Sequence, residues 1–215
     1  PFARFGSSVT QVEGGEQILG REDPEAAACI AKALHEDGVA LHCQATVVEA
    51  SRGHGGSHVV IREGGSLRNI PCDQILLSAG RRPNVEGLDL DRAGVVFDAR
   101  QGIQVNDRLQ TSNPHIYAAG DVCSRFQFTH AADAMARIVI QNALFLGRAR
   151  ASSLNIPWCT YTDPEVAHVG LYEKEAQASN LPVDTLRIDL KDTDRSVLDG
   201  EEEGFLKVHV HRKKA

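Results

Sequence analysis

Apolar and polar positions in the first part of the chain follow an extended period, then a helical period, then an extended period again. Val9–Val12 is rich in β-branched residues and predicts a short strand that ends at Glu13. Asp23–Pro24 predicts a helix start, and apolar residues at helical spacing continue until Gly38. A strand is expected at Val39–Leu41. This order of elements indicates half of a dinucleotide-binding domain.

Further extended segments follow this unit. Thr46–Glu49, His58–Arg62 and Leu67–Ile70 are separated by glycine-rich turns, which predicts an antiparallel meander. The apolar run Gln74–Ser78 predicts a fully buried strand.

Three strand ends carry candidate chemistry. A carboxylate at the position of Glu13 can accept hydrogen bonds from ribose hydroxyls, although a solvated glutamate is the alternative. The small residues after Ser78 let a ligand approach the backbone, or they form a tight turn with solvated arginines. Ile116–Val122 predicts a small-residue strand end that places Asp121 where it can hold the polyol or ribose of a cofactor.

An alanine-rich apolar helix is predicted to start at Thr129 and His130 and to reach about Leu146. Its N-terminal amides can face negative charge. A capped helix without a ligand is the alternative interpretation.

Composition excludes several classes of partner. The net charge of −6 leaves no broad basic field for nucleic acid or anionic lipid. No apolar stretch reaches the roughly 18 residues of a spanning helix, so a cytoplasmic chain is expected. The five scattered cysteines indicate reduced thiols. Because the chain opens at Pro1 and its single methionine is Met135, we expect an excised piece of a longer protein.

Five segments occur in a characteristic order: VTQVE, LLSAGRRPN, LQTSNPHIYAAGDV, FTHAADAMARIVIQNALF and TDPEVAHVGLYEKEA. In this order they resemble the flavoprotein disulfide oxidoreductases, the family that includes dihydrolipoamide dehydrogenase, glutathione reductase and mercuric reductase. The resemblance covers nearly the whole chain. It implies an α/β fold, with part of a Rossmann-like pair of FAD- and NAD(P)-binding domains followed by an incomplete α+β dimerisation domain.

The resemblance also implies three divisions of the chain. Residues 1–78 would be the later part of the NAD(P)-binding domain, residues 79–155 the returning segment of the FAD-binding domain, and residues 156–215 the incomplete dimerisation domain. A homodimer through this last domain is expected.

The family's cofactor contacts transfer to matching positions. Glu13 would hold the adenosine ribose of the nicotinamide cofactor, with Val47 and Gly80 lining the same site. Asp121, after Gly120, would hold the ribityl chain of FAD. Backbone groups would face the flavin pyrimidine edge at Gln127, Phe128, Thr129 and His130. His130 is expected to be a cofactor contact or a packed histidine rather than a general base.

The family's phosphate loops and paired redox cysteines are expected upstream of Pro1, and its acid/base pair downstream of Ala215. We therefore assign no catalytic residue, and we expect the fragment alone to be inactive. His209 and His211 share one strand face, but without a third ligand and beside the basic tail at Arg212, Lys213 and Lys214 they are not interpreted as a metal site.

The expected function is transfer of a hydride from NAD(P)H through FAD to a redox disulfide, in a mercuric-reductase-like enzyme acting on a small-molecule, thiol or soft-metal substrate. Dihydrolipoamide dehydrogenase is one alternative. A non-catalytic dimerisation or binding module is the alternative of another class. NADH is favoured over NADPH, because a carboxylate at Glu13 repels a 2′-phosphate and the nearest following cation is Arg21.

Overall fold

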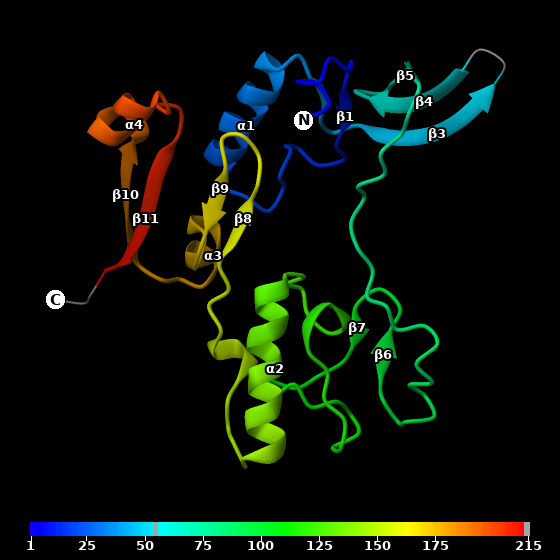
Figure 1. Cartoon of the computed structure of the whole chain (residues 1–215), viewed down its shortest axis with the longest axis vertical. Helices are drawn as coiled ribbons and strands as arrows, with labels where there is room; N and C mark the ends of the chain where they lie inside the picture. The colour runs from blue at the N-terminus through cyan, green and yellow to red at the C-terminus, as the bar shows by residue number, and fades with distance from the viewer. Residues whose placement is uncertain (54–55, 213–215) are drawn as a thin grey trace. The chain divides into compact units, whose positions relative to one another are not determined.

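The computed structural model describes residues 1–53 and 56–212 (Figure 1). These residues form two compact units. The first contains residues 1–77, 159–167 and 171–215, and the second contains residues 78–158 and 168–170. Each unit is described by itself.

The first unit begins with a parallel βαβ arrangement. Strand β1 (Thr10–Val12) pairs in parallel with β2 (Ala40–His42), and helix α1 (Pro24–Glu36) connects them. The side chain of Asp23 accepts a hydrogen bond from the Glu25 amide and caps the helix. The helix buries Ala27 and Ile30, and Gly38 follows it at φ +80°. The predicted strand, helix and strand are confirmed.

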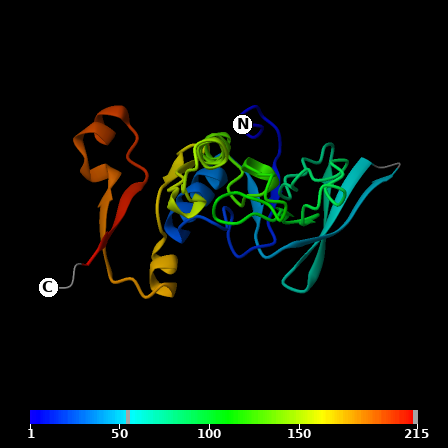
Figure 2. The same cartoon turned by 90° about the horizontal axis from the view of Figure 1, so that it is seen from below.

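An antiparallel meander follows in the same unit. It consists of β3 (Thr46–Gly53), β4 (Gly56–Glu63) and β5 (Ser66–Cys72), paired in the order β3, β4, β5. The meander forms a twisted ribbon (Figure 2). Its predicted strands are confirmed, and each extends beyond the predicted bounds.

The C-terminal part of the first unit is an antiparallel ribbon of β10 (Val183–Asp189) and β11 (Phe205–His211). The short elements α3 (Glu173–Ala178), η3 (Leu190–Asp192) and α4 (Asp194–Asp199) accompany it. Strands β8 (Trp158–Thr160) and β9 (Val166–His168) pair with one another.

The second unit is built around helix α2 (Thr129–Leu144). Its other elements are β6 (Phe97–Asp98), β7 (Gly102–Ile103), η1 (Gly120–Val122) and η2 (Ala151–Ser153). Leu109, Met135 and Ile138 form the core under α2. A second core contains Val85, Leu90, Val95, Ile103 and Ala118. The predicted α2 is confirmed, and the predicted α/β fold class is confirmed as well.

Two predicted strands are wrong. Gln74–Ser78 is irregular, and Leu76 and Leu77 are 78% and 84% exposed. A buried strand requires hydrogen-bonded neighbours and a covering layer, and none of the sheets in the described residues pairs with this segment. The segment ending at Ala119 makes a single bridge, between Tyr117 and Gln110. Its small residues follow a hairpin-like turn rather than a regular strand.

Candidate functional site

The second unit brings several of the predicted cofactor residues together around Arg81. The Arg81 guanidinium lies 3.5 Å from the Asp121 carboxylate and donates a hydrogen bond to the Gln127 carbonyl at 3.1 Å. Gly80 directly precedes Arg81 and has φ +101°, a backbone conformation that favours glycine. Arg81 therefore connects the turn after residue 78 to Asp121 of η1. It also connects this turn to Gln127, which directly precedes the N-cap residue of α2.

Gly120 is required by packing. A Cβ at this position would lie 2.9 Å from the Ala132 Cβ, and its φ is +79°. The absence of a side chain lets η1 lie against the first turn of α2. This close approach places Asp121 beside the beginning of the helix.

The N-terminus of α2 can receive negative charge. Its N-cap residue, Phe128, makes no capping hydrogen bond through its side chain, and Thr129 is the first helical residue. The first amides of a helix have no partner within the helix and carry the positive end of its dipole. A carboxylate such as that of Asp121 can accept hydrogen bonds from hydroxyls, so the two features together would suit a cofactor that carries both a polyol chain and an anionic ring edge.

An aromatic stack follows the same helix start. Phe128 stacks on His130 with ring centroids 5.4 Å apart, and on Trp158 at 6.3 Å. Trp158 also contacts His168 at 4.5 Å. The Nε2 atom of His130 lies 2.7 Å from the Pro157 carbonyl, which accepts only, so Nε2 is the donor. The His130 side chain is exposed, and this hydrogen bond and the stack on Phe128 hold its ring.

Glu13 and Val47 belong to the first unit. The Glu13 carboxylate accepts a hydrogen bond from the Gly15 amide at 2.8 Å, which fixes its orientation directly after β1. The Ala45 amide donates to the Glu13 carbonyl at 3.0 Å. Val47, two residues after Ala45, has an exposed side chain. The hydrogen bond of Ala45 therefore ties the chain just before β3, which carries Val47, to Glu13 at the end of β1.

Arg81 was not identified from the sequence as a site residue. It was only part of the alternative in which the arginines after the turn are solvated. The available signal was a cation directly after the glycine at a predicted strand end. Trp158 was missed too, since it lies 28 residues beyond His130 in the chain.

The cysteines of the described residues are all free. Burial raises the pKa of Cys123 to about 11, and burial followed by the nearby Glu165 raises the pKa of Cys159. Because the thiolate is the reactive form, neither thiol is activated.

The remaining candidates show ordinary surface chemistry. The His209 ring bonds the Thr185 hydroxyl at 3.0 Å. Within residues 1–53 and 56–212, no three or more His, Cys, Asp or Glu side chains gather in a way that could hold a metal ion.

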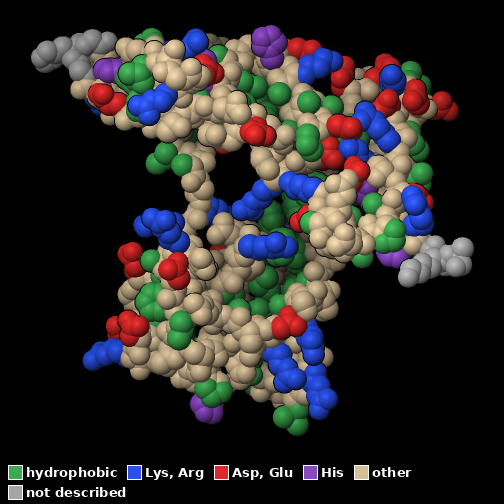
Figure 3. Space-filling view, turned by 180° about the vertical axis from the view of Figure 1, so that it is seen from behind, with side chains coloured by type: hydrophobic (Ala, Val, Ile, Leu, Met, Phe, Trp, Pro, Cys, Tyr) green, Lys and Arg blue, Asp and Glu red, His purple; other side chains and the backbone are tan. Residues whose placement is uncertain are grey.

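No helix in that part of the chain has the length and apolarity to cross a bilayer. Lys213 and Lys214 lie outside the described residues, and Figure 3 shows acidic and basic side chains on the same face of the molecule.

A βαβ arrangement with a carboxylate at the end of its first strand is typical of nucleotide-binding α/β folds. Residues 1–136 match the family model for pyridine nucleotide-disulphide oxidoreductases, and residues 156–215 match the dimerisation domain of the same enzymes. The chain belongs to the pyridine nucleotide-disulphide oxidoreductase family. The predicted resemblance is confirmed, and this family works with FAD and NAD(P)H.

Relatives of two kinds are similar in sequence. Dihydrolipoyl dehydrogenase of Thermus scotoductus is 37% identical over 96% of this chain and 45% of its own length. Mercuric reductase of Staphylococcus aureus is 33% identical over 98% of this chain and 38% of its own length. The chain thus spans less than half of these curated relatives.

Solved structures agree with the fold. The HOCl-induced flavoprotein disulfide reductase RclA of Escherichia coli superposes with a TM-score of 0.83 at 29% identity, over 98% of this chain and 48% of that one. LpdA of Mycobacterium tuberculosis superposes with a TM-score of 0.87 at 26% identity, over 98% and 45% of the two chains.

Proposed function

We propose that this chain is part of a flavoenzyme that transfers a hydride from NAD(P)H through FAD to a redox disulfide. The contact of Arg81 with Asp121 and Gln127, beside the uncapped start of α2, carries the proposal. When bound, FAD would supply the two-electron chemistry that links the nicotinamide to a disulfide. The residues of this chain would bind the two cofactors and orient them.

Each of these residues has a distinct binding role. Asp121 would accept hydrogen bonds from the ribityl hydroxyls, and Gly120 allows η1 to approach the helix start. The backbone of Gln127, Phe128, Thr129 and His130 would hold the pyrimidine edge of the flavin. A helix N-terminus there stabilises negative charge on the ring.

A second set of residues binds the nicotinamide cofactor in the proposed enzyme. Glu13 accepts hydrogen bonds from the adenosine ribose, and its carboxylate is oriented by the Gly15 amide. Val47 would line the same site. NADH is the preferred cofactor, because Glu13 repels a 2′-phosphate.

The proposed substrate is a mercuric ion held by thiols, in a homodimer formed through the dimerisation domain of residues 156–215. Residues 1–78 and 79–155 would contribute to the nicotinamide and FAD domains. Dihydrolipoamide oxidation is the second candidate, since the Thermus scotoductus relative of that name is 37% identical to this chain.

One experiment tests the class and the substrate together. The full-length protein, loaded with FAD, is mixed with NADH and either mercuric ion with excess thiol or oxidised lipoamide. Oxidation of NADH that requires mercuric ion supports the first candidate, and oxidation that requires lipoamide supports the second. No bleaching of the flavin by NADH under anaerobic conditions would refute the enzyme class and favour a non-catalytic dimerisation module.

A further inference from the structure

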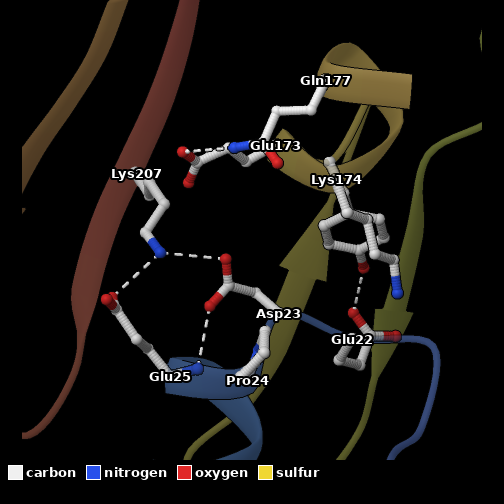
Figure 4. Close-up of a pocket in the computed structure, with 9 residues that line it drawn as sticks. Glu22, Asp23, Pro24, Glu25, Glu173, Lys174, Gln177 and Lys207 are labelled. Carbon is white, nitrogen blue, oxygen red and sulfur yellow. Dashed lines mark hydrogen bonds and ion pairs between the residues drawn. The ribbon is translucent and has the colours of Figure 1, made fainter. Parts of the chain in front are cut away.

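Glu22 and Tyr172 form a buried polar pair in the first unit. Glu22 is 6% exposed and Tyr172 is 8% exposed, and no other charged residue in the described part of the chain is as buried as Glu22. The Tyr172 hydroxyl donates a hydrogen bond to the Glu22 carboxylate (Figure 4). A buried carboxylate is costly without such a donor, so the contact is structurally important.

Glu22 ends the segment that carries Glu13. Its amide donates to the Leu19 carbonyl at 2.8 Å, and its own carbonyl accepts from the Gln17 side chain at 3.3 Å. At the other end of the segment, the Gly15 carbonyl accepts from the Gln44 amide at 2.8 Å. Residues 13–22 are therefore held to the βαβ arrangement at one end and to Tyr172 at the other.

Tyr172 precedes α3, in the part of the chain that matches the dimerisation domain. Burial, followed by the hydrogen bond to Glu22, raises the pKa of Tyr172 above its usual range, so the hydroxyl remains a donor. Its amide is also held, by the Glu175 carboxylate at 3.0 Å. The backbone of Tyr172 is therefore held in place, and its hydroxyl is paired with Glu22.

Ion pairs strengthen the same region. Lys207 of β11 lies 2.9 Å from both Asp23 and Glu25, and Arg187 of β10 pairs with Glu25. Asp23, Glu25 and Lys207 line a pocket of about 360 Å³ together with Glu22 and Tyr172 (Figure 4). The first turn of α1 and the segment before it are thus held by residues of the dimerisation part of the chain.

We propose that Tyr172 is a positioning residue for the nicotinamide nucleotide. Its hydrogen bond to Glu22 holds residues 13–22 in the conformation that presents Glu13 to the adenosine ribose. Tyr172 acts through the segment and does not touch the nucleotide. The inference rests on the proposed role of Glu13, and it makes nucleotide affinity depend on a side chain outside the nucleotide-binding part.

The test uses the full-length, FAD-loaded enzyme with Tyr172→Phe, which removes only the hydroxyl. Tyr161→Phe is the matched control, because Tyr161 is 85% exposed. Hydrogen exchange of the amides in residues 13–22 reports on the segment, and steady-state kinetics give KM and kcat for NADH. In Tyr172→Phe, exchange should become faster and KM should rise about three- to tenfold, with kcat within about twofold. Tyr161→Phe should change neither, and Glu22→Gln, which keeps an acceptor for the phenol, should stay near the parent.

Unchanged exchange in Tyr172→Phe would overturn the proposal, and so would faster exchange with an unchanged KM. Glu13→Leu, measured in parallel, separates this failure from failure of the proposed function. An unchanged KM in Glu13→Leu contradicts the ribose role of Glu13. A raised KM there, with an unchanged KM in Tyr172→Phe, contradicts only the positioning role. If Tyr172→Phe does not fold, Glu22→Leu is measured in its place, with the same expected and contrary results.

Discussion

The guanidinium of Arg81 lies 3.5 Å from the carboxylate of Asp121. Both side chains are partly exposed, so the ion pair by itself contributes little to stability. Its consequence is positional, because it orients the carboxylate beside the start of α2.

Replacing Asp121 should weaken FAD binding. In the full-length enzyme, Asp121→Leu removes a charge-assisted hydrogen bond worth about 1.5 to 3 kcal/mol. Flavin retained after dialysis should fall accordingly. Asp133→Leu is the control, since Asp133 pairs with Arg137 on the exposed surface of α2. Equal retention in Asp121→Leu and the parent would contradict the assigned role.

The choice of nicotinamide cofactor should depend on Glu13. We expect a higher kcat/KM for NADH than for NADPH in the full-length enzyme. Glu13→Gln should narrow that ratio about tenfold, equivalent to ~1.4 kcal/mol, because the repulsion of a 2′-phosphate is removed. A parent enzyme that prefers NADPH would refute the electrostatic argument.

The 215-residue chain should bind little or no flavin on its own. Its residues contain no G-x-G-x-x-G sequence of the kind that cradles a pyrophosphate. Absorbance of the purified chain near the usual flavin bands, measured against protein concentration, checks this. A stoichiometric yellow chromophore would show the expectation to be wrong.

Acid should weaken the contact between α1 and β11. Partial burial opposes ionisation of Asp23, but hydrogen bonds from Lys207 and the Glu25 amide outweigh it and lower the pKa of Asp23. Because the pKa of Asp23 is lower in the folded state, its ionised form stabilises the fold at pH values above the pKa of an unfolded aspartate, which is about 4. This stabilisation is lost as the pH falls through the pKa of Asp23 in the folded state.

The variant Asp23→Asn keeps a good N-cap and removes the charge. It should lose about 1–2 kcal/mol of stability at neutral pH, with a smaller loss at pH 2 to 3. Urea unfolding of the variant and the parent at several pH values measures the loss of stability at neutral pH and in acid. The same difference from the parent at every pH would contradict the role of the charge.

Gly102 should tolerate no side chain. A Cβ there would lie 2.1 Å from the Val122 carbonyl oxygen, so Gly102→Ala should cost about 3 kcal/mol. Gly94→Ala has a similar positive φ and open space, and should cost only about 1 kcal/mol. Thermal unfolding of both variants gives the comparison, and equal losses would contradict it.

Local signals in the sequence were sufficient for the βαβ arrangement. The strand before Glu13, the cap at Asp23 and the stop at Gly38 each depend on neighbouring residues and on helical or extended periodicity. The meander was predictable for the same reason, because its turns are short and rich in glycine. The order of the family's segments indicated Asp121 and the start of α2.

Features that depend on residues far apart in the sequence were decided by the tertiary structure. The run at Ile75, Leu76 and Leu77 has the composition of a buried strand, yet its exposure is set by whether other strands pair with it. Arg81 reaches Asp121 across 40 positions of sequence, and Glu22 meets Tyr172 across 150. No periodicity encodes such pairs, since they form only when packing brings separate elements together. The sequence alone thus determined the family and the elements that depend on neighbouring residues, and the packed fold decided which segments become strands and which distant side chains meet.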